Sequence, residues 1–319
     1  MKEDVLLYIS NNTNINKIET SVTNNETNKE KSLKNKSDVN LANQINSEDK
    51  LVKIAGFKKA MTKSMTLSNS IPSFLYSDEY NVDNLIKIRE DVNFTYKKEL
   101  KFSYMPFIIK AVSNSLKYYP ELNSIINPSV NEDGLIYEYI IKGKHNISIA
   151  IDGPEGLVVP NIKDVAKKSI KEIQEDLLSL RDKTYNKKLS SSDLTGGTFS
   201  ISNIGNIGGK QLGPVIMSPQ TCIIGISRMI DAIKIVDKDK LNHFEDIDYL
   251  GNNSHLGKYA EYKNSNISMF KDNEKKGVIF HKAINFCISA DHRVIDGASI
   301  AKFSEKLKSY IENPMKILI

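Results

Sequence analysis

The chain of 319 residues contains 40% hydrophobic residues, enough for one domain of about 200 to 250 residues with a sizeable core and additional segments. Its 44 basic and 39 acidic residues give a net charge of +5, and no dense basic block with interleaved aromatic residues predicts a nucleic-acid-binding surface. No apolar run is long enough to cross a membrane, and the two cysteines, Cys222 and Cys287, lie in apolar runs, which argues against a disulfide framework or a metal site.

The first fifty residues divide into two parts. Residues 1–10 have an acidic start and then an apolar group that suits a short helix. Residues 11–49 are rich in Asn, Lys, Ser, Thr and Glu and nearly lack large apolar side chains, so they cannot bury enough surface to offset the entropy cost of ordering. We therefore predict a disordered linker over 11–49.

From residue 50 onward the apolar spacing alternates between that of helices and that of strands. Helices are predicted where apolar residues recur every three or four positions, over 54–65, 81–91, 104–116, 170–180 and 297–312. Strands are predicted over 71–79, 145–151, 157–160, 221–227, 283–289 and the first part of 195–209. A turn at 152–156 should join two of these strands as a hairpin. The pattern indicates an α/β domain.

Two further segments have an unusual composition. Residues 195–209 are rich in glycine, but they lack the Gly-Lys-Ser/Thr ending of a P-loop and the strand–GxGxxG–helix unit of a dinucleotide site. Residues 231–277 are polar, and we predict a surface loop insertion at about 238–276 that leaves the core undisturbed. His243 and His255 within it are predicted to be solvated.

A histidine motif follows the last predicted strand. The sequence Ser-Ala-Asp-His-Arg-Val-Ile-Asp-Gly at 289–297 places His292 on a turn between that strand and the final helix. A neutral imidazole, with an ordinary pKa near 6.5, is suited to remove the proton from a thiol whose pKa is near 8.5. A histidine in such a position can also be purely structural, so the neighbouring residues decide the interpretation.

This motif resembles the His-x-x-x-Asp-Gly signature of the dihydrolipoyl acyltransferases of 2-oxo acid dehydrogenase complexes, which belong to the chloramphenicol acetyltransferase superfamily. Residues 199–205 are similar to the family's Phe-x-x-Ser-Asn-x-Gly segment, and 120–123 to its Pro-x-Leu-Asn turn. Ser202 and Asn203 are nearest the branched-chain type, because many acetyltransferases carry Ser-Ser there. The resemblance covers 52–319 apart from the insertion.

The resemblance implies a two-layer α/β sandwich, with a mixed sheet covered by helices. It implies homotrimers with active sites between subunits, assembled into a cubic core. Residues 50–319 would be the catalytic domain and 1–10 the remnant of a peripheral-subunit-binding domain. The lipoyl domain and a mitochondrial targeting segment would then lie outside this sequence, the location would be the mitochondrial matrix, and the 2-oxo acid decarboxylase and dihydrolipoyl dehydrogenase would bind through the N-terminal domains.

The implied reaction is transfer of an acyl group, of the branched-chain type, from S-acyl-dihydrolipoyl lysine to coenzyme A without a metal. His292 would be the general base and Ser202 the hydroxyl donor to the oxyanion. Asp296 would hold the active-site turn through an arginine, and Arg293 would either join that network or be a surface residue. The expected coenzyme A-binding residues are Arg89, Asn203, Gly205, Gly208 and Gly209.

Two alternatives stay open at this stage. The first is an acetyl-transferring core of a pyruvate dehydrogenase complex, because acyl specificity depends on a pocket volume that the sequence does not give. The second is a non-catalytic core or docking protein of such a complex. Relatives of that kind tend to lose the histidine, whereas this chain has both His292 and Ser202.

Overall fold

The computed structural model describes residues 49–96, 99–126, 135–237 and 276–317. Contacts divide the chain after Ile54, and all described helices and strands belong to the unit that begins at Ala55. The predicted helix at 1–10 and the predicted linker at 11–49 lie outside the described residues, except for Asp49. The predicted insertion at about 238–276 also lies outside them, except for its last residue.

The described strands form one large mixed sheet of seven strands. Its order is β1-β11-β9-β8-β4-β7, and β10 also pairs with β11. The strands are β1 (Ser73–Asn81), β4 (Ile147–Ile149), β7 (Asn161–Ile162), β8 (Phe199–Asn203), β9 (Cys222–Ile226), β10 (Ile230–Asp237) and β11 (Lys276–Asp291). The pairs β4–β8 and β8–β9 are parallel and the others antiparallel, so the predicted mixed sheet is confirmed.

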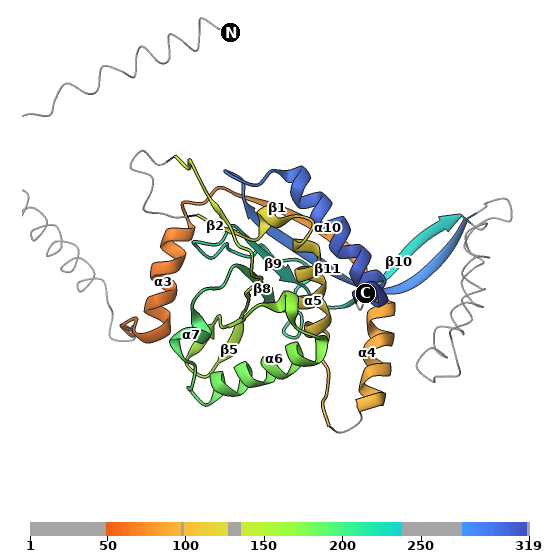
Figure 1. Ribbon diagram of the computed structural model, residues 1–319, viewed down its shortest axis with the longest axis horizontal. Helices are drawn as coiled ribbons and strands as arrows, with labels where there is room; N and C mark the ends of the chain where they lie inside the picture. The colour runs from red at the N-terminus through yellow and green to blue at the C-terminus, as the bar shows by residue number, and fades with distance from the viewer. Residues whose placement is uncertain (1–48, 97–98, 127–134, 238–275, 318–319) are drawn as a thin grey trace, which may run out of the picture. The chain divides into compact units, whose positions relative to one another are not determined.

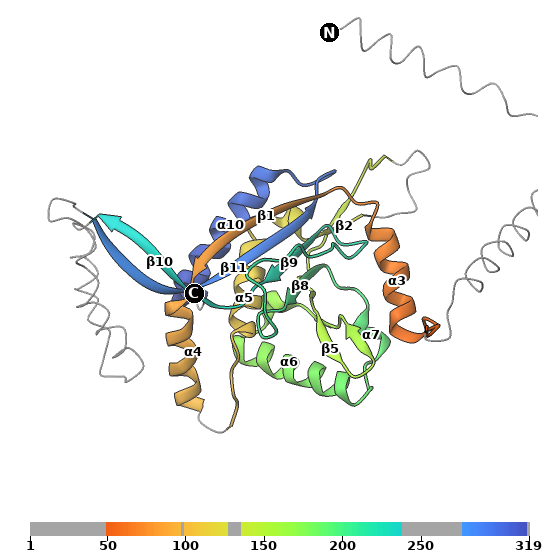
Figure 2. The ribbon, with the colours of Figure 1, turned by 180° about the vertical axis from the view of Figure 1, so that it is seen from behind.

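Helices form the second layer (Figure 1; Figure 2 from behind). The covering helices are α4 (Asp83–Tyr96), α5 (Met105–Leu116), α6 (Ile170–Tyr185) and α10 (Gly297–Glu312). Helix α10 packs on β1 and α5, and α5 packs on α6. The Phe303 ring of α10 lies 6.1 Å from the Phe199 ring of β8, and both side chains are fully buried. The predicted two-layer α/β sandwich is therefore confirmed.

The order of the helices follows the predicted apolar spacing, but some helices are longer than predicted, such as α6, which runs to Tyr185 instead of 180. Helix α4 runs to Tyr96, five residues beyond its predicted end. Nothing in Asp83–Tyr96 stops it, because the segment contains neither Pro nor Gly. Helix α5 is buried on almost all sides, including its polar residues Ser113, Asn114 and Ser115. Short 3-10 helices complete the layer at η2 (Pro120–Leu122), η3 (Val165–Lys167) and η5 (Pro314–Ile317).

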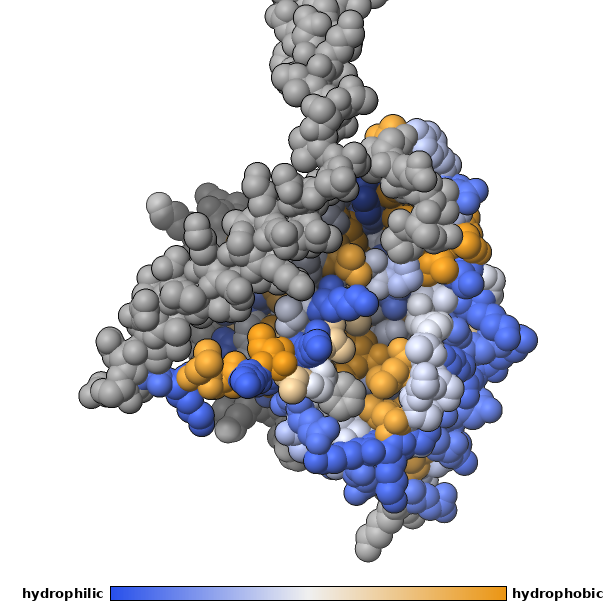
Figure 3. Space-filling view, turned by 90° about the vertical axis from the view of Figure 1, so that its left-hand side faces the viewer, coloured by the Kyte–Doolittle hydropathy of each residue, from blue (hydrophilic) through white to orange (hydrophobic). Residues whose placement is uncertain are grey.

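Helix α3 (Gly56–Ser68) forms where the sequence predicts an amphipathic helix, but its apolar stripe stays open. Met61 is 46% exposed and Leu67 is 55% exposed. Figure 3 views the side of the molecule where α3 lies in Figure 1, and hydrophobic side chains reach the surface there among hydrophilic ones. Exposed apolar side chains that cluster on one surface often indicate an interaction site.

The predicted hairpin is present, but the strand before it is divided. Strand β4 ends at Ile149 within the main sheet, and β5 (Ile151–Gly153) then pairs with β6 (Gly156–Val158) in a separate sheet. The prediction of one continuous strand over 145–151 is thus wrong. The division occurs at Ala150, whose N–H donates to the carbonyl of Ile201 before the chain turns away. The other two-stranded sheet joins β2 (Ser124–Ile125) to β3 (Ile140–Ile141).

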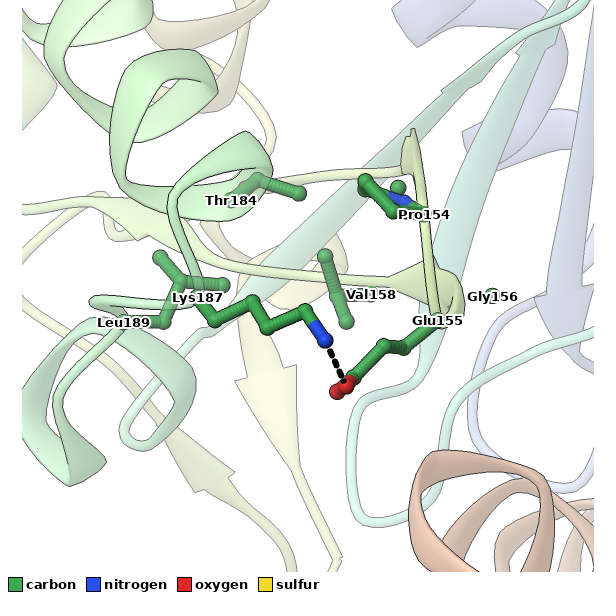
Figure 4. Close-up of a pocket in the computed structure, with 8 residues that line it drawn as sticks. Pro154, Glu155, Gly156, Val158, Thr184, Lys187 and Leu189 are labelled. Atoms are coloured by element: carbon green, nitrogen blue, oxygen red, sulfur yellow. Dashed lines mark hydrogen bonds and ion pairs between the residues drawn. The ribbon is translucent and has the colours of Figure 1, made fainter.

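The tip of the β5–β6 hairpin packs on the C-terminal end of α6 (Figure 4). A Cβ on Gly153 would lie 2.8 Å from Cγ2 of Thr184, so this close approach requires glycine. Lys187 binds Glu155 across a cavity of about 90 Å³. Ligand pockets for molecules of ordinary cofactor size occupy roughly 300 Å³ or more, so this cavity does not suit coenzyme A.

The residues that flank the predicted surface insertion form a regular β-ribbon. Strand β10 pairs with β11 from Ile230 opposite Ala283 to Asp237 opposite Lys276. The ribbon occupies both ends of the polar stretch 231–277 and stops where the predicted loop at about 238–276 begins and ends, so that loop stays a prediction. Ile233 pairs with Phe280, and both are exposed, at 63% and 37%. Strand β10 was not predicted because single Asp and Lys residues lie between its isoleucines, although its apolar residues alternate with period two.

A buried histidine just before β4, which bonds to helix α5, gives a pH-dependent prediction. His145 is buried, with Nδ1 2.8 Å from Oγ of Ser113, and burial lowers its pKa, with Lys117 adding to the effect. Below pH about 6.5 the unfolded chain therefore binds a proton that the folded chain does not. We expect the free energy of unfolding to be unaffected by this residue above pH about 6.5 and to fall as the pH decreases from there.

Urea denaturation at pH values about one unit above, at and one unit below this value measures the effect. The native chain should lose up to about 1.4 kcal/mol per pH unit through this one residue. The variant His145→Gln should lose less, because it removes only this titration. Equal slopes in both proteins would show that His145 does not cause the acid sensitivity.

Candidate active site

His292 lies on the turn after β11, and the structure determines which of its ring nitrogens is basic. Its side chain is exposed, and its backbone N–H donates to the carbonyl of Pro72 at 2.9 Å. Nδ1 lies 2.9 Å from the carbonyl oxygen of Ile295. A carbonyl oxygen can only accept, so Nδ1 carries the hydrogen and Nε2 keeps its lone pair. The arrangement leaves a base directed at an accessible surface.

Phe74 supports His292 from the neighbouring strand, a contact that no sequence motif indicates. The two ring centroids are 5.0 Å apart, with the planes inclined at 49°. A Cβ on Gly297 would lie 3.1 Å from Cζ of Phe74. The Phe74 ring therefore leaves little room for a side chain at 297, which favours glycine in the motif. The alternation of β1 could have identified Phe74 as inward-facing, but only the β1–β11 pairing places it at His292.

No arginine binds Asp296 among the described residues, contrary to the prediction. The Asp296 carboxylate accepts from the N–H of Ser299 at 2.8 Å and from its hydroxyl at 3.0 Å, so Asp296 is the N-cap of α10. These bonds lower the pKa of Asp296. Arg293 instead binds Asp291, with Nη2 2.7 Å from Oδ2. An N-cap is recognisable in sequence as an Asp directly before a helix, and this signal was available at 296.

Ser202 lies near the end of β8, partly exposed. Its hydroxyl group has no hydrogen-bond partner among the described residues, so the group is available as a donor. Asn203 follows it and holds the turn, since its Oδ1 accepts from the N–H of Gly205 at 2.9 Å. Its Nδ2 lies 3.2 Å from Sδ of Met105 at the start of α5.

The structure brings together some of the predicted coenzyme A-binding residues. The guanidinium of Arg89 lies 4.3 Å from the centre of the Tyr104 ring, and Tyr104 precedes Met105, which contacts Asn203. Arg89 Nε is buried without a hydrogen-bond partner among the described residues. These residues connect α4 and the start of α5 to the end of β8.

The three predicted glycines of the following loop differ in their constraints. A Cβ on Gly205 would lie 2.5 Å from the carbonyl oxygen of Ser227, so the backbones approach too closely for any other residue. Gly209 has φ +82°, a conformation that favours glycine. A Cβ on Gly208 would have no atom within 4 Å, so packing does not require glycine there. The shape of the loop is sufficient to explain why glycine occurs at 205 and 209, so neither residue is evidence for a bound ligand.

A cavity of about 500 Å³ lies where β8 begins, and none of the predicted site residues lines it. Its lining includes Lys142, Gly197 and Pro219. Within the described ranges no group of three or more His, Cys, Asp or Glu side chains could hold a metal ion. Among the described helices none is long and apolar enough to cross a membrane.

The register of the sheet separates Ser202 from His292. Ser202 is opposite Gly225, and Gly225 is opposite Cys287. His292 lies five residues beyond Cys287, which corresponds to roughly 17 Å along the strand and roughly 10 Å across two strand spacings. A donor and a base for one reacting carbonyl must both lie within hydrogen-bonding reach of the reactants. One chain therefore does not bring the two residues to the same site.

Comparisons with known proteins place this geometry in context. Residues 46–319 match the family 2-oxoacid dehydrogenases acyltransferase (catalytic domain). The chain is 39% identical over 272 residues to the lipoamide acyltransferase component of the branched-chain alpha-keto acid dehydrogenase complex of Caenorhabditis elegans, covering 85% of this chain and 51% of that protein. The corresponding protein of Bos taurus is 37% identical, with coverage of 85% and 48%. The chain thus spans about half the length of the curated relatives it matches.

Solved structures agree with the sequence matches. A probable dihydrolipoamide acetyltransferase from Listeria monocytogenes superimposes with a TM-score of 0.65 at 28% identity, covering 84% of this chain and 96% of that one. The cubic core of the pyruvate dehydrogenase multienzyme complex has a TM-score of 0.67 at 24% identity, which concerns the fold alone, with coverage of 85% and 95%. Since the family match spans nearly the whole described unit, the chain belongs to the 2-oxoacid dehydrogenases acyltransferase (catalytic domain) family.

Proposed function

We propose that the chain is the catalytic part of a dihydrolipoyl acyltransferase that transfers an acyl group, of the branched-chain type, from S-acyl-dihydrolipoyl lysine to coenzyme A. The observation that carries the proposal is the exposed imidazole of His292, whose Nδ1–H is bound to Ile295 so that Nε2 is free as a base. The names of the relatives from Caenorhabditis elegans and Bos taurus support the branched-chain type.

In the proposed reaction His292 acts first. Its Nε2 takes the proton of the coenzyme A thiol, and the thiolate attacks the carbonyl carbon of the acyl thioester. The hydroxyl of Ser202 donates a hydrogen bond to the resulting oxyanion. When this intermediate collapses, the dihydrolipoyl sulfur leaves and takes the proton back from the imidazolium. Acyl-coenzyme A and a free dihydrolipoyl thiol result, so charge and protons balance.

Asp296 has a structural role in the proposed site. By capping α10 it fixes where the helix begins, five residues after His292. It does not need to exchange a proton in this mechanism.

Coenzyme A is proposed to bind at the end of β8. Arg89 is connected to this end through Tyr104 and Met105, and Asn203 and the 205–209 loop form the adjacent backbone. A guanidinium with an unpartnered Nε suits a phosphate group. No metal is needed for this thiol chemistry, because the imidazole supplies the base. The lipoyl group is proposed to come from a separate domain.

Assembly into trimers, and of trimers into a cubic core, is part of the proposal. Three separate surfaces of the described unit expose apolar side chains, which association would cover: Met61 and Leu67 on α3, Ile233 and Ile235 on β10, and Met315 on η5. We also propose that the partner components are the 2-oxo acid decarboxylase and the dihydrolipoyl dehydrogenase, and that the protein works in the mitochondrial matrix, as the names of the relatives suggest.

Acyl transfer to coenzyme A from acetyl, isobutyryl and isovaleryl dihydrolipoamide tests the function and the acyl preference together. We expect higher kcat/KM for the two branched donors. A clear preference for acetyl would favour the pyruvate dehydrogenase alternative. Absence of transfer from all three donors by correctly assembled protein would favour a non-catalytic core protein.

Ser202→Ala tests the oxyanion donor. One lost donor of this kind typically lowers kcat by about 10² to 10³. The KM for coenzyme A should change little, because the hydroxyl matters mainly once the oxyanion has formed. Ser200→Ala is a matched control on the same face of β8, since Ser200 bonds to Gln220 rather than facing a substrate. A raised KM with unchanged kcat would assign Ser202 to binding instead.

A further inference from the structure

Asp291 is a buried carboxylate that the proposed mechanism does not use. It ends β11 and is completely inaccessible to solvent, the only acidic side chain among the described residues that is buried. Placing a carboxylate in a protein interior is costly unless it is paired and hydrogen-bonded. A residue directly before the proposed base thus occupies an unfavourable position, and the structure shows what compensates for it.

Arg293 supplies nearly all of the compensation. The Asp291 carboxylate accepts from the backbone N–H of Arg293 at 3.1 Å, from Nε at 2.9 Å and from Nη2 at 2.7 Å. The two side-chain bonds form the bidentate fork that a guanidinium makes with a carboxylate. Arg293 is only one-third exposed, and its bond to Asp291 raises its pKa. The residues on both sides of His292 are consequently locked to each other.

The backbone of Asp291 forms further hydrogen bonds that hold the turn around His292. Its carbonyl oxygen accepts from the N–H of Ile295 at 3.0 Å, and its own N–H donates to the carbonyl of Thr221 at 2.8 Å. The carbonyl of Ile295 is the acceptor for Nδ1–H of His292. The side chain of Asp291 therefore binds Arg293, the residue after His292. The backbone carbonyl of Asp291 binds Ile295, whose own carbonyl accepts the hydrogen bond from the imidazole.

We infer that Asp291 and Arg293 form a positioning pair that keeps the His292 imidazole in the Nδ1–H tautomer, with Nε2 directed to the substrate side. The catalytic importance of this pair rests on the proposed function, but the effect of the pair on the tautomer of His292 does not. Of the two aspartates in the motif, Asp291 orients the base, whereas Asp296 caps the helix. Desolvation offsets much of the attraction in a buried ion pair, so the pair is not needed to explain stability, and we assign it the positioning of the imidazole.

The first test is Asp291→Asn in the full chain. The substitution keeps the shape but removes the charge and replaces one acceptor with an NH₂ group, so the fork cannot form. An imidazole held in the wrong tautomer loses activity even when it stays in place, and we expect kcat to fall at least about tenfold with both KM values within about twofold. If this variant does not fold, Arg293→Gln removes the same fork from the more exposed side, and Arg293→Lys shows whether charge alone suffices.

Asp78→Asn provides the matched control. Asp78 of β1 binds Lys308 of α10 at 3.1 Å in a partly buried ion pair that does not touch His292. We expect a lower melting temperature and unchanged kcat. This separates a loss of stability from a loss of positioning.

The second readout does not depend on activity. In ¹⁵N-histidine spectra of the neutral protein, the resonances of His292 are identified by their loss in His292→Asn. They should report Nδ1–H in the native chain and in Asp78→Asn, and a shift toward Nε2–H or a mixture in Asp291→Asn. A folded Asp291→Asn that keeps Nδ1–H and loses no more kcat than Asp78→Asn would overturn the inference. If the native chain transfers no acyl group, the proposed function is wrong. The spectra would still test whether Asp291 and Arg293 determine the tautomer of His292.

Discussion

Replacing His292 with Asn should lower kcat at least about a hundredfold, because general-base help of this kind is worth roughly 10² to 10⁴ in rate. Neither the fold nor the assembly should change. The His292 side chain is exposed, and its backbone bond to Pro72 does not depend on the imidazole. The measurement is kcat for acyl transfer to coenzyme A, together with melting temperature and native mass.

His243→Asn is the control for this experiment, since His243 lies in the predicted insertion and has no role in the proposed reaction. It should keep full activity. A His292→Asn protein of native mass that retains most of its activity would remove His292 as the base. If His292→Asn has a lower melting temperature and an altered native mass, the same test is made with His292→Gln. Glutamine is longer than asparagine by one methylene group.

The periodic parts of the fold could be predicted from sequence because they depend on local spacing. Helices α5, α6 and α10 have apolar residues every three or four positions, and β11 alternates. The prediction failed where a strand carries charges between its apolar residues, as β10 does with Asp231 and Lys234. It also failed at Ala150, where the chain leaves the main sheet without any Pro or Gly at that position.

The candidate site was predictable only in part. The motif identifies His292, but its support comes from Phe74, which is more than two hundred positions away in sequence and reaches it through the β1–β11 pairing. The bond between Asp291 and Arg293 joins residues two positions apart, a spacing that carries no periodic signal on a turn. Resemblance assigned an arginine to the wrong aspartate of the motif, because it transfers residue identities but not hydrogen bonds.

The distance between Ser202 and His292 could not be deduced from the sequence either. It follows from the register of β8, β9 and β11, which places the two residues at different ends of the sheet. If both act on one carbonyl, they must come from different subunits. This requirement fits trimers that are assembled head to tail, where one surface of each subunit meets a different surface of the next.

Mixing two inactive variants should therefore restore activity. In trimers refolded from equal amounts of His292→Ala and Ser202→Ala chains, a junction is intact when its histidine comes from a Ser202→Ala chain and its serine from a His292→Ala chain. Random assembly gives about a quarter of all junctions this composition, so we expect about a quarter of the native activity. If each chain held its own complete site, the mixture would show only the mean of the two variants.

The reciprocal mixture makes the test independent of small differences between preparations. Native chains refolded with an equal amount of the double variant His292→Ala, Ser202→Ala keep about a quarter of their junctions intact if the site is shared, but about half of their sites if it is not. Native mass spectrometry must show mixed trimers in both experiments. With mixed trimers present, activity at the mean of the variants in the first mixture and at half in the second would rule out a site shared between subunits. It would then leave Ser202 or His292 without a part in the reaction, because the strands hold them too far apart within one chain.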